Sequence, residues 1–221
     1  MRKYEVVLFD LDGTLTASGE GITKSVQYAL NKMGKEEMGK DLKALEVFIG
    51  PPLLKQFMTF CDITEDEAEL AVKYYRERYT VTGIFENHPY PGVEELLKRL
   101  KEKGYLLCVA SSKPDHMVHI VLEHFHLEQY FDVIWGSDIN RPKMTKAQVI
   151  ELVLEELVYK DQKEKAVMVG DRSHDVEGAN QVGISCIGVT YGYGNQEELT
   201  QAGAWKIAET VEEIEEILEG K

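Results

Sequence analysis

A chain of 221 residues with 43% hydrophobic content is long enough for one full core and a small additional domain, which excludes a disordered or low-complexity protein. The 39 acidic residues outnumber the 25 basic ones, so the formal net charge is −14. Because such a surface repels phosphate backbones, we expect neither nucleic acid nor an anionic membrane as a partner.

The cysteines and the N-terminal residues indicate the cellular compartment in which we expect the protein. Cys61, Cys108 and Cys186 lie far apart, and we expect free, buried thiols in a reducing environment. No apolar run approaches the roughly 20 residues that span a bilayer, and "MRKYEVV" lacks the apolar core of a signal peptide. These features predict a cytoplasmic protein.

The predicted strands, in chain order, are short runs rich in Val and Ile. Such near-continuous apolar runs are typical of strands that are buried on both faces of a parallel sheet. The sequence predicts strands at 4–9, 105–110, 132–135, 166–169 and 184–189.

Helical periodicity separates these strands. Apolar residues recur at helical spacing over 93–100, 117–125, 149–157 and 211–218. The last of these helices opens on Thr210 with Glu213 three residues later, which is a capping-box pattern. The alternation predicts an α/β fold with a doubly wound, mostly parallel, Rossmann-like sheet.

One segment between the first two strands breaks the alternation. Residues 17–84 show helical patterns only, with a turn signal at 50–52, and they are too many for a simple crossover. We therefore predict an all-helical domain at 17–84, inserted into a catalytic core formed by 1–16 and 85–221.

Polar side chains follow three of the predicted strands. Since ligands of doubly wound sheets bind beyond the carboxyl ends of the strands, these side chains should share one crevice. Several carboxylates would repel one another there, whereas a divalent cation with a phosphoryl group would satisfy them, and hard oxygen ligands suit Mg²⁺. The residues are Asp10, Asp12, Ser111, Ser112, Lys113, Asp171 and Asp175, with Lys143 and Lys146 before the next helix.

At these residues the chain resembles the haloacid dehalogenase superfamily, specifically its phosphatases with a helical cap. The matching motifs occur in the order typical of that superfamily: "DLDGTLT" at 10–16, "VASSK" at 109–113, a lysine near 146 and "VGDRSHD" at 169–175. Within the superfamily the chain is similar to the phosphoglycolate phosphatase-like group, which includes 5′-nucleotidases. That group shares "FIGPPL", "YPGV" and "GVTYGYG". The resemblance covers essentially the whole chain.

The resemblance implies a role for each position around the transferred phosphoryl group. Asp10 would be the nucleophile that forms an aspartyl-phosphate, and Asp12 would act first as acid and then as base. Because side chains two apart on a strand share a face, both carboxylates can flank one phosphorus. Ser111 would donate a hydrogen bond to the phosphoryl group with Ser112 assisting. Gly13 would let the backbone turn beneath the phosphate, where free N–H groups hold its oxygens.

The resemblance also implies a magnesium site. Mg²⁺ would be ligated by Asp171, the Asp10 carboxylate and the Asp12 backbone carbonyl. Asp175 would bind through a metal-bound water or orient a neighbour.

Two lysines compete for the role of bridging nucleophile and phosphate. Many relatives carry this lysine in a "KP.P" stretch, which favours Lys143 in "PKMT". In the group that this chain most resembles, the lysine directly precedes a helix, as Lys146 does in "TKAQVI". We choose Lys146.

The implied activity is Mg²⁺-dependent hydrolysis of a small phosphomonoester, with phosphoglycolate as the first guess. The alternatives are a 5′-nucleotidase or pyrophosphatase of the same family, a phosphomutase, and a non-catalytic phosphometabolite-binding protein. The glycine–tyrosine segment 188–194 is either a loop at the rim of the site or a plain turn. Both a monomer and a homodimer remain open.

Overall fold

The protein is described by a computed structural model, which covers residues 3–138 and 144–220. The chain divides into two compact units, Met1–Thr16 with Pro89–Lys221, and Ala17–His88. The second unit contains the predicted helical segment 17–84 and residues 85–88, and the Ala17 N–H donates a hydrogen bond to the His88 carbonyl at 2.8 Å.

The larger unit is built on a parallel sheet, as predicted. In the described part of the chain the sheet has six strands in the order β3-β2-β1-β4-β5-β6. Every pairing is parallel. The strands are β1 (Val6–Phe9), β2 (Leu106–Pro114), β3 (Val133–Ser137), β4 (Ala166–Gly170), β5 (Ser185–Val189) and β6 (Lys206–Ala208). Sequence analysis did not predict β6, and it ended β2 at residue 110.

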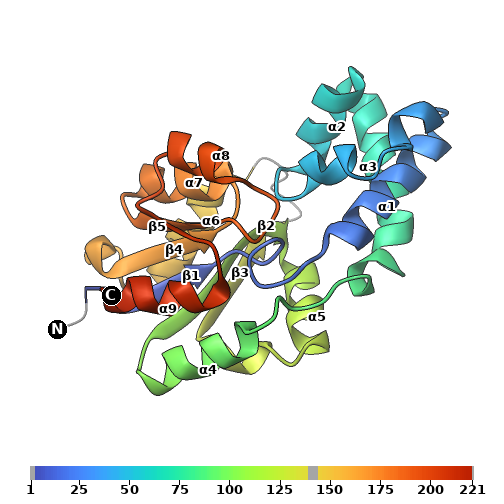
Figure 1. Cartoon of the computed structure of the whole chain (residues 1–221). Helices are drawn as coiled ribbons and strands as arrows, with labels where there is room; N and C mark the ends of the chain where they lie inside the picture. The colour runs from blue at the N-terminus through green and yellow to red at the C-terminus, as the bar shows by residue number, and fades with distance from the viewer. Residues whose placement is uncertain (1–2, 139–143, 221) are drawn as a thin grey trace. The chain divides into compact units, whose positions relative to one another are not determined.

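Helices cover both faces of this sheet, which confirms the doubly wound arrangement (Figure 1). One face carries α6 (Lys146–Glu156), α7 (Ser173–Val182) and α8 (Gln196–Gln201). The other carries α4 (Val93–Glu102), α5 (Asp115–His124) and α9 (Val211–Glu219). Two single 3-10 turns, Glu128–Tyr130 and Lys163–Lys165, lead into β3 and β4.

The core lies between the sheet and these helices. All four residues of β1 are buried, as near-continuous apolar sequence predicts for a central strand. Leu8 and Met168 belong to one apolar cluster with Ile150 of α6 and Val176 of α7. The three cysteines are buried and free, as expected.

The smaller unit is helical. It comprises α1 (Gly19–Lys32), α2 (Leu53–Cys61) and α3 (Glu65–Tyr79), with 3-10 turns at Glu36–Gly39, Ala44–Phe48 and Gly83–Phe85. Helix α3 begins at a capping box between Thr64 and Glu67. Arg78 of α3 donates two hydrogen bonds to Glu86, at 2.7 and 2.9 Å, and so ties the last turn of the unit to its third helix.

The chain order creates a switch point in the sheet. From β1 the chain moves outward to β2 and β3, and β4 then pairs with the other edge of β1. In doubly wound sheets, ligands bind beyond the carboxyl ends of the strands at such a point, which here is the end of β1 and β4. None of the helices in the described residues has the length and apolar character needed to cross a membrane.

Candidate active site

The carboxyl ends of β1 and β4 present the buried acids of the larger unit. Asp10 directly follows β1, and its N–H donates to the carbonyl of Val169 in β4 at 2.9 Å. Asp171 directly follows β4, and Asp175 lies in the first turn of α7. All three side chains are at most 2% exposed. The structure thus gathers three carboxylates that sequence analysis placed in one crevice.

Lys146 is the cation of this cluster. Its Nζ lies 2.8 Å from Asp10 Oδ1 and 2.8 Å from Asp175 Oδ1, and it donates a hydrogen bond to the Ala110 carbonyl at 2.9 Å. It is the first residue of α6, and Gly178 of α7 leaves room for its stem, since a Cβ there would stand 2.8 Å from Lys146 Cγ. Lys143, the alternative lysine, lies outside the described residues.

The charges of the cluster perturb one another. Burial works against the charge of Lys146, yet the Asp10 and Asp175 carboxylates raise its pKa above the ordinary value. Burial raises the pKa of Asp10, and Lys146 opposes this shift only in part. Burial also opposes the ionisation of Asp175, but nearby His174 and Lys146 hold the pKa of Asp175 below its usual range.

Asp171 is the acid that the protein leaves incompletely paired. Its Oδ2 accepts a hydrogen bond from the Tyr193 N–H at 2.8 Å, while its Oδ1 has no hydrogen-bond partner among the described residues. Burial and the Asp175 carboxylate raise the pKa of Asp171 well above its ordinary value. A buried carboxylate oxygen with no donor is costly unless a cation supplies the missing charge.

These acids fit a divalent cation. Ligand atoms of Asp10, His174 and Asp175 all lie within 4.8 Å of one another. Together with the unpaired oxygen of Asp171, they offer mostly hard ligands that suit Mg²⁺. His174 lies inside the motif "GDRSHD", and sequence analysis assigned it no role because the histidines of the chain show no metal-ligand spacing.

Asp12 has a separate counter-ion, Lys113, which sequence analysis placed in the same crevice without assigning it a role. Lys113 Nζ lies 2.8 Å from Asp12 Oδ2 and 3.1 Å from Oδ1. Lys113 closes the quoted motif "VASSK", and its place directly after a predicted strand was the available signal.

Gly13 lies in the tight turn that follows β1. Its N–H donates to the Thr16 carbonyl at 2.8 Å, so this N–H is not free to hold a phosphate oxygen, because the tight turn uses it. Its φ of +89° favours glycine, and an added Cβ would stand 2.2 Å from Asp171 Oδ2. Gly13 is thus required by the turn and by the close approach of Asp171.

The serines follow the same edge of the sheet on β2. Ser111 is buried, and its Oγ accepts a hydrogen bond from the Lys113 N–H at 3.3 Å. Ser112 is half-buried. The structure therefore places Ser111 beside the Asp12–Lys113 pair.

The glycine–tyrosine segment lies against the site. Besides the Tyr193 contact with Asp171, the Tyr191 hydroxyl donates to the Thr14 carbonyl at 2.9 Å. A Cβ at Gly192 would stand 2.2 Å from the Gly13 carbonyl oxygen, so only glycine fits without a shift. We call residues 191–194 the tyrosine loop.

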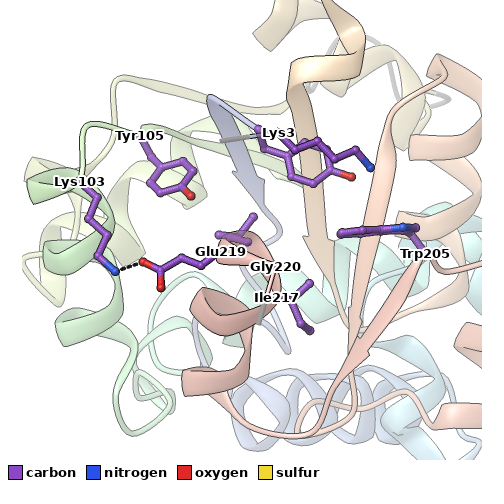
Figure 2. A pocket seen from close by; sticks show the side chains of 9 residues that line it. Lys3, Lys103, Tyr105, Trp205, Ile217, Glu219 and Gly220 are labelled. Carbon is purple, nitrogen blue, oxygen red and sulfur yellow. Dashed lines mark hydrogen bonds and ion pairs between the residues drawn. The ribbon is translucent and has the colours of Figure 1, made fainter. Parts of the chain in front are cut away.

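A pocket of about 590 Å³ lies at the opposite end of the strands (Figure 2). It is lined by residues that precede strands, such as Tyr4, Tyr105 and Trp205, and by the end of α9, where Lys103 pairs with Glu219. It contains none of the paired acids of the site. We therefore assign the candidate active site to the carboxylate cluster.

A doubly wound sheet with buried acids and a lysine at its switch point is typical of α/β enzymes that handle a phosphoryl group beside a cation. The sequence pattern of the haloacid dehalogenase-like hydrolases matches residues 7–189. The chain belongs to this family.

Individual relatives agree with the family. A 5′-nucleotidase of Pseudomonas aeruginosa is 44% identical over 89% of this chain and 87% of its own length. A phosphoglycolate phosphatase of Aquifex aeolicus is 31% identical over 85% of each chain. The crystal structure of a predicted phosphatase from Clostridium acetobutylicum, 47% identical, superposes with a TM-score of 0.93 over 98% of this chain and 99% of its own. The chain is thus an enzyme of the phosphatase class, similar to both groups that its motifs resemble.

Proposed function

We propose that the protein is a Mg²⁺-dependent phosphomonoester hydrolase that works through an aspartyl-phosphate on Asp10. The observation that carries the proposal is the buried lysine that bridges Asp10 and Asp175 beside the unpaired oxygen of Asp171. Lys146 offsets the charge of the nucleophile and of an incoming phosphate, so an anion can approach three buried acids.

The proposed reaction has two half-reactions. In the first, an Asp10 carboxylate oxygen bonds to phosphorus, the ester P–O bond breaks, and protonated Asp12 gives its proton to the departing alkoxide. In the second, water attacks phosphorus and gives a proton to the Asp12 carboxylate, while the bond between phosphorus and Asp10 breaks. The products are an alcohol and inorganic phosphate.

The other proposed roles follow the positions of the side chains. Ser111 donates its hydroxyl hydrogen to a phosphoryl oxygen, with Ser112 assisting. Mg²⁺, held by Asp10, the Asp12 carbonyl, Asp171 and Asp175, would neutralise charge on the phosphoryl oxygens. We further propose that the helical unit is the cap domain that the family resemblance implies.

The substrate is a small phosphomonoester. One relative, 44% identical, is a 5′-nucleotidase, so nucleoside 5′-monophosphates are the first class to test. Phosphoglycolate, which the sequence motifs suggested first, is the second.

A phosphate-release screen tests the proposal. The purified protein is assayed with nucleoside 5′-monophosphates, phosphoglycolate and pyrophosphate, each with Mg²⁺ and with EDTA, and the Asp10→Asn variant serves as the blank. We expect Mg²⁺-dependent release from at least one ester and none from the variant. Release by the variant would contradict the nucleophile. Phosphate release that requires a bisphosphate primer would favour a mutase, and metabolite binding without release would favour a binding protein.

A further inference from the structure

Asp12 is held by a lysine that the proposed reaction does not yet use. Strand β2 continues to Pro114, and Lys113 near its end is only 8% exposed. Both oxygens of the Asp12 carboxylate lie within 3.1 Å of Lys113 Nζ. A buried pair in this two-oxygen geometry fixes the side-chain torsions of both partners, because rotation of either one breaks a charge-assisted hydrogen bond.

This pair is separate from the lysine that serves the nucleophile. Lys146 contacts Asp10 and Asp175, whereas Lys113 contacts Asp12. The carboxylates of Asp10 and Asp12 are two residues apart, and two like charges so close push each other away. Each therefore has its own cation, and these cations come from different elements, α6 and β2.

We propose that Lys113 is a positioning residue for Asp12, an inference that rests on the proposed hydrolase function. It holds the carboxylate where one oxygen can reach the leaving-group oxygen and later the attacking water. Because its N–H also donates to Ser111 Oγ, the same residue connects the phosphate-binding serine with the acid–base group.

The proposal separates substrates by their leaving groups. An alkoxide needs a proton as it departs, so phosphorylation of Asp10 by an alkyl phosphate depends on a correctly placed Asp12. The p-nitrophenolate ion departs unprotonated at neutral pH, so phosphorylation by p-nitrophenyl phosphate does not. Hydrolysis of the aspartyl-phosphate needs Asp12 as base whichever ester supplied the phosphate.

The test compares Lys113→Met, Lys113→Arg and Asp12→Asn with the wild-type protein by rapid mixing. With p-nitrophenyl phosphate, we expect Lys113→Met to release about one p-nitrophenolate per site in a fast burst, followed by slow turnover. With an alkyl phosphate that the wild type hydrolyses, we expect turnover to fall on the order of 10²-fold without a burst, which is the typical size of an acid–base contribution. Asp12→Asn should show the same pattern, and Lys113→Arg should recover part of the loss.

Controls separate positioning from damage to the fold. Lys98→Met removes an exposed lysine of α4 and should leave both assays unchanged. Melting temperature and Mg²⁺ binding of Lys113→Met are measured alongside. Two results for Lys113→Met would overturn the role of Lys113. One is loss of the burst with p-nitrophenyl phosphate to the same extent as turnover, and the other is turnover of the alkyl phosphate near the wild-type value. The proposed hydrolase function fails on a different result, a wild type no more active than Asp10→Asn.

Discussion

At the scale of single residues, most buried carboxylates of the site contact a particular lysine. Lys146 balances Asp10 and Asp175, and Lys113 balances Asp12, while Asp171 keeps one oxygen without a donor in the described part of the chain. Removing one partner of a buried pair leaves a stranded charge, which typically costs about 3–5 kcal/mol. The pairs are therefore sensitive to single substitutions, and we propose that the unpaired oxygen of Asp171 is a metal ligand.

Loss of the Lys146 ammonium should abolish turnover and weaken the fold. In Lys146→Ala, Asp10 and Asp175 stay buried without their shared cation, so we expect the free energy of unfolding to fall by about 3–5 kcal/mol. Urea unfolding and phosphate release measure the two effects. Lys143→Ala is the comparison that decides between the two lysines. Our choice is wrong if Lys143→Ala abolishes turnover while Lys146→Ala keeps it.

Neutralising Asp171 should remove the response to Mg²⁺ without weakening the metal-free protein. Asn can still accept the Tyr193 N–H, and it no longer buries an anionic oxygen that lacks a donor. A ligand that binds only the folded state raises the melting temperature, so the wild type should melt higher in Mg²⁺ than in EDTA. We expect Asp171→Asn to lose this shift and Asp66→Asn, at an exposed site of α3, to keep it. An unchanged shift in Asp171→Asn would exclude Asp171 as a ligand.

At the scale of elements, the sequence patterns predict the strands that carry runs of apolar residues. They miss strand segments that consist of polar residues and are held in the sheet by pairing with a neighbouring strand. Four of the five predicted strands are central in the sheet, and their runs of Val, Ile and other apolar residues reveal them; β3 lies at an edge but still carries Val133, Ile134 and Trp135. Strand β6 is a three-residue edge strand that begins with an exposed lysine, so it leaves no apolar run to detect. Strand β2 carries polar residues through "SSKP", which in sequence look like a turn.

The same distinction explains the site. Asp10, Asp12 and Asp171 follow strands, so topology alone predicts their common crevice. The Asp12–Lys113 pair depends on the register in which Phe9 lies opposite Val109, and on the continuation of β2 beyond residue 110. Neither is visible in a single sequence, and the tyrosine loop reaches Asp171 by an equally non-local contact.

Filling the space at Gly192 should displace the tyrosine loop from Asp171. Gly192→Ala forces a shift of the Gly13 carbonyl or of Asp171, and overpacking of this kind typically costs about 1–3 kcal/mol. We expect a lower melting temperature and weaker Mg²⁺ binding by calorimetry. Gly39→Ala is the control, because its Cβ would meet nothing nearer than 3.4 Å. Wild-type Mg²⁺ affinity in Gly192→Ala would show that the loop does not position the ligand.

The Arg78–Glu86 contact should make the helical unit sensitive to acid. Hydrogen bonds from Arg78 lower the pKa of Glu86 below its ordinary value. The contact therefore contributes stability at pH above the unfolded-state pKa of about 4.3, and this contribution is lost as pH falls through the lower folded-state pKa. We expect the free energy of unfolding, measured by urea denaturation, to fall less between pH 6 and pH 3 in Glu86→Gln than in the wild type.

A matched variant makes this comparison specific. Glu69→Gln changes an exposed glutamate of α3, and it should lose as much stability on acidification as the wild type. If acidification lowers the free energy of unfolding equally in Glu86→Gln and in the wild type, the Arg78–Glu86 contact does not cause the acid sensitivity.

At the scale of the whole molecule, the net charge of −14 acts on stability independently of any single pair. Like charges repel over the screening length, which shortens from about 30 Å at 0.01 M salt to about 8 Å at 0.15 M. We expect the melting temperature in EDTA to rise with NaCl over this range. A matched series with sorbitol controls for solvent effects that are not ionic. A fall with NaCl would mean that ion pairs outweigh the repulsion.

The way the chain leaves and re-enters the larger unit also has a practical consequence. Thr16 and Pro89 form an antiparallel bridge, and the Tyr90 N–H donates to the Leu15 carbonyl at 3.0 Å. The two ends of the interruption are therefore neighbours within one bonded turn, so the residues between them form a cassette. We expect that helical segments from relatives can be grafted at this junction, and that a short linker can replace the cassette altogether.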